Sequence, residues 1–325
     1  MPFVVFGAGA IGAVVGARLH QAGHRVTLVA RGAHLAALRR RGLRLESPDR
    51  AEVVTVPTVG DPSAVDWSED QVVLLAVKSQ HTLAALAALA ASAPSRTPIV
   101  CLQNGIANEP AALRLFANVY GVSVACPTSF VQPGVAQAWS APVTGLLDVG
   151  RYPSGTDHTC EDVARVLASA TFDAHSIGDI LRWKHRKLLT NLGNAIEAVC
   201  GPHARQGRLG DLLVAEGEAV LSVAGLEAAT ADEDRNRRAD LLRLGTINKA
   251  TRPGGSSWQS VHRRTGNIET DYLNGEIVLL GRTHAVPTPA NELMQQLARE
   301  CATGRRSACS VSESAILAQL VARQT

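Results

Sequence analysis

The sequence has few aromatic residues, and its cysteines lack the spacing of a metal or redox site. Phe, Trp and Tyr make up only 4% of the 325 residues, so Ala, Val and Leu must fill most of the core. None of the six cysteines forms a C-x-x-C pair, and no Cys and His residues have metal-ligand spacing. We therefore expect no metal and no redox pair. We expect reduced, buried thiols in a cytoplasmic protein.

The sequence also lacks a strong charge of one sign and a long apolar run. The net charge is +3, and no clustered basic stripe indicates a nucleic-acid surface. The most apolar helical stretch, residues 83–93, is much shorter than the roughly 20 residues that a membrane span needs. The N-terminus has no basic segment of a signal peptide. We expect neither nucleic acid nor a membrane as a partner.

The first half of the chain alternates short apolar runs with helical patterns. Continuous runs such as residues 3–6 (FVVF) and 72–77 (VVLLAV) are typical of strands buried on both faces. Further strands are predicted at 25–30, 53–57, 99–102, 119–125 and 172–177, with two short strands between 134 and 150. Helices are predicted at 11–21, 33–41, 81–91, 109–116 and 160–170. This α/β order predicts a Rossmann-type doubly wound sheet over residues 1–177.

After Gly178 the strand pattern ends and helical segments dominate. They are predicted at 179–200, 209–224, 231–249, 271–282 and 289–302. We therefore predict an all-α C-terminal domain over residues 178–325, with a helix break at 252–257 (RPGGSS). The charge-rich run at 232–243 is interpreted as a solvated helix face.

A glycine-rich motif follows the first predicted strand. Residues Gly7-Ala8-Gly9-Ala10-Ile11-Gly12 have the pattern G-x-G-x-x-G and open a predicted helix, the context in which the pattern indicates a dinucleotide site. Gly7 permits a tight turn, Gly9 lets the backbone approach a pyrophosphate, and Gly12 allows close packing of helix on strand. A glycine-rich turn without a ligand is the alternative.

The end of the second predicted strand indicates which dinucleotide binds. An NAD-selective site usually has an acidic residue there, which accepts a hydrogen bond from the ribose 2′-hydroxyl. This chain has Arg31 instead, a natural partner for a 2′-phosphate. We therefore predict NADP(H) as the cofactor. Arg31 as an ordinary surface charge is the alternative.

Two polar segments of the helical domain are candidates for chemistry. Lys187, Asn191 and Asn194 are spaced i, i+4, i+7, which predicts one polar helix face where a lysine could protonate a carbonyl oxygen. A solvated stripe on a surface helix is the alternative. Ser256 and Ser257 stand at a helix start, where they could cap the helix or bind a small acid. Glu269 precedes a predicted helix, so it could take part in the chemistry or could equally be an acid that the N-terminus of the helix favours.

Several further segments occur together in a characteristic order. They are LLAVKSQ (residues 74–80), LQNG (102–105), WKHRKLLTN (183–191), SSWQS (256–260), IETDYLNGEI (268–277) and AVPTP (285–289). With the N-terminal GAGAIG, they make the chain resemble the ketopantoate reductase (2-dehydropantoate 2-reductase) family over essentially its whole length.

This resemblance implies a role for individual residues. Lys187 matches the family's general acid, and Asn191 matches an amide that contacts the substrate. Glu269 matches an acid that interacts with substrate and cofactor. Either Ser256 or Ser257 matches the serine that holds the substrate carboxylate. The resemblance also implies that Asn104 and Lys78 lie beside nicotinamide and substrate, and that Arg31 binds the 2′-phosphate.

The chain departs from the family pattern near the substrate. The second family asparagine is expected at Ala195, whereas this chain has Asn194 one position earlier. The family glutamine three residues after Lys78 is His81 here, with Gln80 before it. The spacing from Gln259 to Glu269 is one residue longer than expected. These shifts affect the substrate side more than the hydride donor.

The expected reaction is NADPH-dependent reduction of a 2-oxo acid held between the two domains, with ketopantoate as the expected substrate in coenzyme A biosynthesis. One alternative is a related reductase that acts on another 2-oxo acid or a specialised metabolite. Another is a dinucleotide-binding sensor without turnover. A homodimer through the helical domain is compatible with the sequence.

Overall fold

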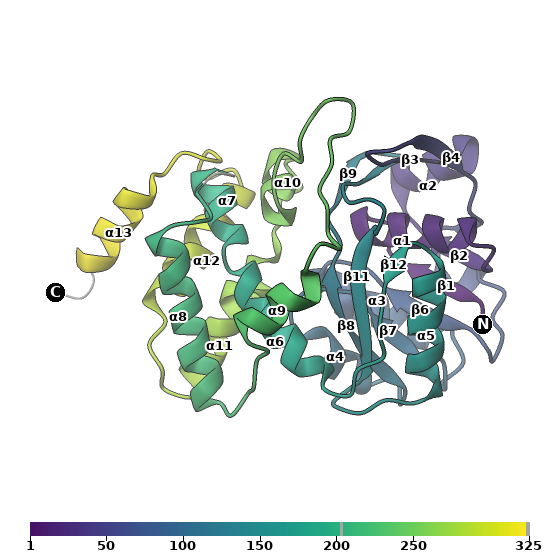
Figure 1. Cartoon of the computed structure of the whole chain (residues 1–325), viewed down its shortest axis with the longest axis horizontal. Coiled ribbons are helices and arrows are strands. Elements are labelled where there is room, and N and C mark those ends of the chain that lie inside the picture. The colour runs from purple at the N-terminus through teal and green to yellow at the C-terminus, as the bar shows by residue number, and fades with distance from the viewer. Residues whose placement is uncertain (202–203, 323–325) are drawn as a thin grey trace. The chain divides into compact units, whose positions relative to one another are not determined.

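The computed structural model describes residues 1–201 and 204–322. The chain divides into two compact units, whose elements are labelled in Figure 1. Unit 1 consists of Met1–Lys184 together with Ala231–Arg252, and unit 2 of His185–Thr230 together with Pro253–Thr325. The boundary after Lys184 lies slightly beyond the predicted one at residue 178. The segment Ala231–Arg252 belongs to unit 1, which the sequence did not predict.

The core of unit 1 is an eight-stranded sheet. Its spatial order is β12 (Phe172–Asp173), β11 (Gly145–Arg151), β8 (Val119–Ala125), β7 (Ile99–Cys101), β6 (Val72–Leu75), β1 (Phe3–Phe6), β2 (Val26–Val29) and β5 (Thr58–Val59). All neighbours from β8 to β5 are parallel, and β11 is antiparallel to β8. The strand order reverses between β1 and β6, and such a switch point places a ligand crevice at the carboxyl ends of the strands. The predicted doubly wound sheet is therefore confirmed.

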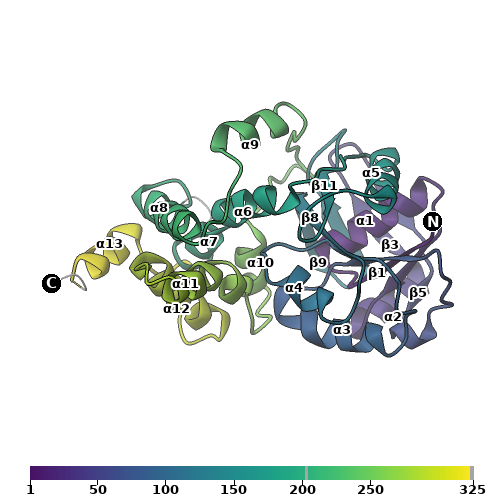
Figure 2. The same ribbon diagram turned by 90° about the horizontal axis from the view of Figure 1, so that it is seen from below.

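Helices cover both faces of this sheet (Figure 2). The bounds of the helices are α1 (Ala10–Gln21), α2 (Gly32–Arg41), α3 (Thr82–Ala90), α4 (Asn108–Leu113) and α5 (His158–Ser169). In Figure 2, α1 and α5 lie on one face, and α3 and α4 on the other. α1 packs tightly because its glycines leave room: a Cβ at Gly16 would lie 2.4 Å from Cδ2 of Leu28.

Unit 1 also contains a second, four-stranded sheet. Its order is β4 (Ala51–Val54), β3 (Leu43–Glu46), β10 (Val135–Ala138) and β9 (Thr128–Gln132). α1 contacts β3, β9 and β10, so this sheet covers the helix face turned away from the main sheet. The sequence did not predict β3 or β9. The strand expected at 53–57 is wrong, because β4 ends at Val54 and β5 begins at Thr58. The strand expected at 172–177 ends at Asp173.

The segment of residues 231–252 returns to unit 1 and carries α9 (Ala231–Arg238). Arg237 donates to both carboxylate oxygens of Asp148 at 2.7–2.8 Å and lies 2.6 Å from Asp173. Arg182 makes a similar two-point contact with Glu233. The interpretation of 232–243 as a solvated helix face is therefore wrong for Arg237 and Glu233. The helix expected over 231–249 ends at Arg238.

The described residues of unit 2 form helices only, which confirms the all-α prediction. The helices are the second part of α6 (Ile180–Asn191), then α7 (Asn194–Cys200), α8 (Arg208–Val223), α10 (Ser256–His262), α11 (Asn274–Thr283), α12 (Pro289–Ala302) and α13 (Glu313–Ala322), with a 3-10 turn at Glu269–Tyr272. The single helix predicted over 179–200 is wrong, because Leu192 and Gly193 form a turn between α6 and α7. The helix expected from residue 271 begins at Asn274.

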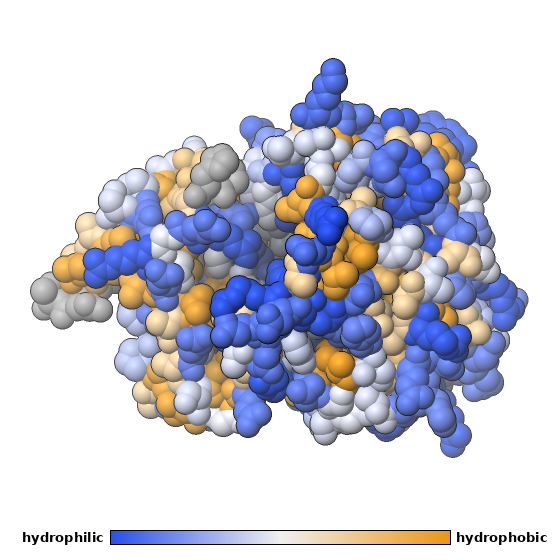
Figure 3. Space-filling view, viewed as in Figure 1, coloured by the Kyte–Doolittle hydropathy of each residue, from blue (hydrophilic) through white to orange (hydrophobic). Residues whose placement is uncertain are grey.

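The surface drawn in Figure 3 is mostly hydrophilic, with hydrophobic residues in separate groups. Among the described residues, no helix is long and apolar enough to cross a membrane. In the same residues, no group of three or more His, Cys, Asp or Glu side chains could hold a metal.

Candidate active site

The glycine-rich turn between β1 and α1 has the geometry that a dinucleotide needs. Gly7 has a φ of +103°, and a Cβ there would lie 2.7 Å from Cγ1 of Val77. A Cβ at Gly12 would lie 2.1 Å from the carbonyl oxygen of Gly7, so only glycine lets the helix start here. Gly9 is exposed, with nothing within 4 Å of the Cβ position, which leaves its backbone open to a ligand.

The start of α1 suits an anion. No side chain caps this helix, and its first turn contains no acidic residue. Its first N–H groups can therefore hydrogen-bond a phosphate, which the helix dipole also favours. Ala10 and Ile11 form this first turn and are half-buried.

A cavity of about 390 Å³ lies beside this turn. Gly7, Ala8 and Gly9 line it together with Arg31, which follows β2. Its other lining residues, which the sequence did not single out as cofactor residues, are Phe6, Val29, Ala30, His34, Val77, His81, Ala84, Ala85 and Phe130. The glycine turn and the cationic residue Arg31 therefore line one cavity.

His34 joins the cavity to the second sheet. Its Nδ1 accepts a hydrogen bond from the backbone N–H of Gly134 at 2.9 Å, which leaves the proton of the neutral ring on Nε2. The ring packs edge-on against Phe130, with centroids 4.9 Å apart. Burial lowers the pKa of His34 below its usual value, so the ring is neutral near pH 7. A neutral imidazole here preserves the contact with Gly134.

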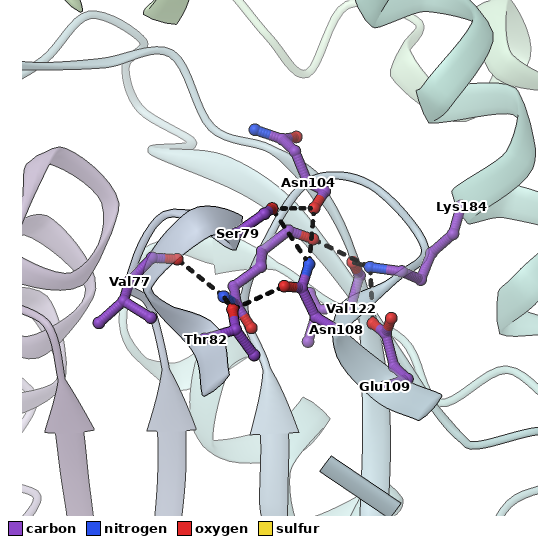
Figure 4. A network of polar contacts seen from close by, with 9 residues as sticks. Val77, Ser79, Thr82, Asn104, Asn108, Glu109, Val122 and Lys184 are labelled. Carbon is purple, nitrogen blue, oxygen red and sulfur yellow. Dashed lines mark hydrogen bonds and ion pairs between the residues drawn. The ribbon is translucent and has the colours of Figure 1, made fainter. Parts of the chain in front are cut away.

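Lys78 and Asn104 follow two adjacent strands, β6 and β7. A buried network joins these strand ends (Figure 4). The side-chain amide of Gln103 donates to the carbonyl oxygen of Val77 and to Oγ1 of Thr82, both at 2.8 Å. Asn108 accepts from Thr82 at 2.7 Å and donates to the carbonyl oxygen of Asn104 at 3.0 Å. The network thus fixes the backbone next to both predicted residues.

A buried ion pair lies at the other side of this network. Nζ of Lys184 is 2.8 Å from Oε1 of Glu109, and the two side chains are 2% and 0% exposed. The same ammonium donates to the carbonyl oxygens of Gln103 at 2.9 Å and Val122 at 3.2 Å. Gly121 of β8 makes room, because a Cβ there would lie 3.1 Å from Cδ of Lys184. The N-terminal part of α6 is therefore fixed to the carboxyl end of the sheet.

Lys187 and Asn191 belong to the part of α6 in unit 2. Lys187 is half-buried, and Asn191 is buried one turn later. Asn194 is also buried, but it begins α7 after the turn at Leu192 and Gly193. The expected single face of three polar residues on one continuous helix is therefore wrong for Asn194. The polar pair Lys187 and Asn191 keeps its i, i+4 spacing on α6.

Asn194 instead lies beside the segment that leads to the serine pair. Oδ1 of Asn194 is 3.4 Å from the Cβ position of Gly255, which directly precedes Ser256 and Ser257. Gly255 donates its backbone N–H to Oε2 of the buried Glu197 on α7 at 2.5 Å. Ser257 is buried and Ser256 is half-buried, and neither side chain caps α10. Unit 2 therefore brings one predicted amide next to the predicted serines.

A second ion pair supports this segment. Arg205 donates to Oε1 of Glu197 at 3.0 Å and also to the carbonyl oxygen of Thr190. Arg205 is 37% exposed, whereas Glu197 is 8% exposed. Glu197 therefore holds the N–H of Gly255 with one oxygen and a partly solvated cation with the other.

Glu269 opens the 3-10 turn that precedes α11 and is buried. Asn274, at the start of α11, donates to the carbonyl oxygen of Leu192 at 3.2 Å and to Oδ1 of Asn291 at 3.1 Å. The Glu269 segment is thus attached to the turn that separates α6 from α7. Like Lys187, Asn191 and the serines, Glu269 belongs to unit 2.

Two family models match this chain. The model described as ketopantoate reductase PanE/ApbA matches residues 3–150, and the model of the C-terminal part of the same enzyme matches residues 179–302. The chain belongs to the ketopantoate reductase family. It is an oxidoreductase of this family, for which a nicotinamide dinucleotide is the typical cofactor.

Individual members of the ketopantoate reductase family resemble the chain over most of its length. The 2-dehydropantoate 2-reductase of Pyrococcus horikoshii is 28% identical over 306 residues, which cover 92% of this chain and 97% of that protein. A PanE/ApbA family ketopantoate reductase from Ralstonia eutropha JMP134 is 26% identical, with a TM-score of 0.76 over 94% of this chain and 99% of that one. A ketopantoate reductase described as dimeric, from Staphylococcus aureus, has a similar fold.

A protein described as a dehydrogenase has a similar fold. D-mandelate dehydrogenase, solved with NADH and anilino(oxo)acetate, has a TM-score of 0.79 at 22% identity and covers 94% of this chain and 99% of that one. At this identity the likeness concerns the fold.

The sequence analysis did not single out four residues that the structure places next to the predicted site residues of units 1 and 2. Glu109 and Lys184 pair in unit 1, His34 lines the cavity beside the glycine turn, and Glu197 accepts from the N–H of Gly255. Glu197 had a usable signal, because it is the one charged residue in the segment LGNAIEAVC (residues 192–200). Lys184 had no such signal, since it stands among His185, Arg186 and Lys187.

Proposed function

We propose that this protein reduces 2-dehydropantoate (ketopantoate) to pantoate with NADPH, a step of coenzyme A biosynthesis. The observation that carries the proposal is the cavity shared by the Gly7–Gly9 turn and Arg31. A guanidinium there favours a 2′-phosphate over a 2′-hydroxyl, because charged hydrogen bonds contribute about 1.5–3 kcal/mol. The proposed substrate rests on the likeness to 2-dehydropantoate 2-reductases over 92% of the chain.

The residues of unit 1 would hold the cofactor. The N–H groups at the start of α1 would bind its pyrophosphate, and Arg31 its 2′-phosphate. Lys78 and Asn104 would flank the nicotinamide, because they follow the strands next to the switch point. When bound, NADPH supplies the hydride that the carbonyl carbon of the oxo acid accepts.

The residues of unit 2 would bind and protonate the substrate. Lys187 would give a proton from Nζ to the carbonyl oxygen as that oxygen gains negative charge, so that the product is a 2-hydroxy acid. Asn191, one turn later, would orient this oxygen. Ser257 or Ser256, with Asn194 nearby, would bind the carboxylate, and Glu269 would hold substrate and cofactor groups in place.

A related reductase of another 2-oxo acid is the second candidate. Asn194 lies on α7 beside Gly255, whereas the family pattern predicts an asparagine at Ala195. His81, which stands where the family has glutamine, lines the cavity beside the glycine turn. Both shifts change the amides and rings near the site without removing Lys187, so they favour altered substrate choice over lost reduction.

An assay with a substrate panel tests the proposal. The oxidation of NADPH and of NADH would be followed with ketopantoate and with other 2-oxo acids that differ in the size of their side chain. We expect the highest kcat/KM with ketopantoate and NADPH. Turnover only with another oxo acid would assign the second candidate function, and no turnover with any 2-oxo acid would refute both.

A further inference from the structure

We propose that the buried Lys184–Glu109 ion pair is a positioning device for Asn104, an inference that rests on the proposed function. Hydrogen bonds fix the backbone carbonyl group of Gln103, which precedes Asn104, and that of Asn104 itself. The carbonyl oxygen of Gln103 accepts from Nζ of Lys184 at 2.9 Å, and that of Asn104 accepts from Asn108 at 3.0 Å. In Figure 4 the side chain of Asn104 points away from the network. The backbone of Asn104 is thus fixed by the network, while its side-chain amide points away from the network.

Stability alone does not explain a charged pair at this place. Moving two charges out of water costs more than their attraction usually returns, so apolar side chains of similar volume would serve stability as well or better. The ammonium of Lys184 does what an apolar group cannot, since it binds Gln103, Val122 and Glu109 together. Apart from this ion pair, the described residues give the Glu109 carboxylate no hydrogen bond.

The same contacts separate the roles of the two nearby lysines. The ammonium of Lys184 has three acceptors for its three protons, and its side chain is 2% exposed. It therefore has no proton left for a substrate. Lys187, one turn later and half-buried, keeps the role of proposed proton donor. Lys184 is a positioning residue, whose effect on turnover passes through Asn104.

The decisive variant removes both charges, Lys184→Met together with Glu109→Leu. A single change would leave one buried charge unpaired and could unfold the protein, whereas the double change leaves none. We expect a folded protein with faster amide hydrogen exchange in residues 102–108, because the carbonyl oxygen of Gln103 loses the donor that Lys184 supplied. We also expect a fall in kcat on the order of 100-fold, as for a misplaced contact group.

A matched control comes from the same helix. Arg182→Met with Glu233→Gln removes another ion pair of α6, in which the guanidinium makes two hydrogen bonds to the carboxylate. We expect its exchange in residues 102–108 and its kcat to equal those of the wild type. A gentler test is Gly121→Ala, which keeps both charges but places a Cβ 3.1 Å from Cδ of Lys184 and 3.3 Å from Oε1 of Glu109.

The exchange measurement decides the proposal even without turnover. Unchanged exchange in residues 102–108 of the double variant overturns it, as does wild-type kcat. If the double variant fails to fold, Gly121→Ala decides, with faster exchange expected and unchanged exchange overturning the proposal. If the wild type reduces no 2-oxo acid but the double variant shows faster exchange, the proposed function fails while the positioning role stands.

Discussion

In each unit an ion pair hydrogen-bonds the backbone next to predicted site residues, and the two pairs differ in their access to water. In unit 1, Lys184 and Glu109 are 2% and 0% exposed, behind Asn104. In unit 2, Arg205 is 37% exposed, and it meets Glu197 behind Ser256 and Ser257. Water can replace a lost partner in the second pair but not in the first. The first pair therefore fixes the loop at 102–108 firmly, whereas the segment before Ser256 can change its conformation more easily.

The contrast follows from the secondary structure of each region. The ends of β6 and β7 meet at the edge of a sheet that is buried on both faces, where an unpaired polar group is costly. The serine pair instead follows a Pro-Gly-Gly turn at the start of the short helix α10, and the cation of its ion pair is partly solvated. The buried pair of unit 1 and the partly solvated pair of unit 2 follow from these two settings.

The largest expected effect is on the chemical step, which we assign to unit 2. Lys187→Met removes the proposed proton donor, so kcat should fall about 10²- to 10⁴-fold. The dissociation constant of NADPH, measured by fluorescence titration, should stay near that of the wild type, because the cavity belongs to unit 1. Lys249→Met, at an exposed position of unit 1, is the matched control. Near-normal kcat for Lys187→Met would refute the assignment.

The next effect tests the two ion pairs directly. Glu109→Leu leaves the ammonium of Lys184 buried and unpaired, which should lower the free energy of unfolding by about 3–5 kcal/mol. Glu197→Leu leaves the N–H of Gly255 without its acceptor, but water can reach Arg205, so the loss should be about 1–3 kcal/mol. Urea unfolding at fixed pH measures both values. Equal losses would remove the contrast between the two pairs.

A third prediction concerns cofactor choice within unit 1. Arg31→Ala should weaken the binding of NADPH about tenfold or more and leave that of NADH nearly unchanged, because only NADPH carries the 2′-phosphate. Titration of the protein with both cofactors measures the ratio. Arg40→Ala, at an exposed position of α2, should leave this ratio unaltered. The same ratio in Arg31→Ala and the wild type would show that Arg31 does not select the cofactor.

The smallest effect is a pH dependence of stability at His34. Burial lowers its folded pKa below 6.5, so the unfolded chain binds the proton more readily. Stability should therefore fall as the pH drops from about 6.5 through the lower folded pKa, and level off below it. Chemical unfolding of the wild type and of His34→Gln at several pH values would show this, because the glutamine does not titrate. Identical pH profiles would contradict the prediction.

Much of unit 1 could be predicted because its signals are local. The run FVVF followed by GAGAIG specified β1, the turn and α1, and the turn shares its cavity with Arg31. The second sheet was missed, because its strands are short and mixed in polarity, such as LRLE in β3. In unit 2, periodicity predicted α12 to the residue but ran α6 and α7 together. The turn at Leu192 and Gly193 carries no proline and only one glycine, and its carbonyl contact with Asn274 comes from a distant segment.

The sequence by itself determined the family, the doubly wound sheet, the helical second unit and the glycine-rich turn between β1 and α1. These depend on residue periodicity and on glycines at fixed spacing, which act through the neighbouring backbone. Only the tertiary structure decided which polar residues support the site. Lys184 meets Glu109, and Glu197 meets Gly255, because the folded chain brings distant segments together and excludes water between them. Burial of this kind turns an ordinary lysine into a fixed support for Asn104, and no local pattern records it.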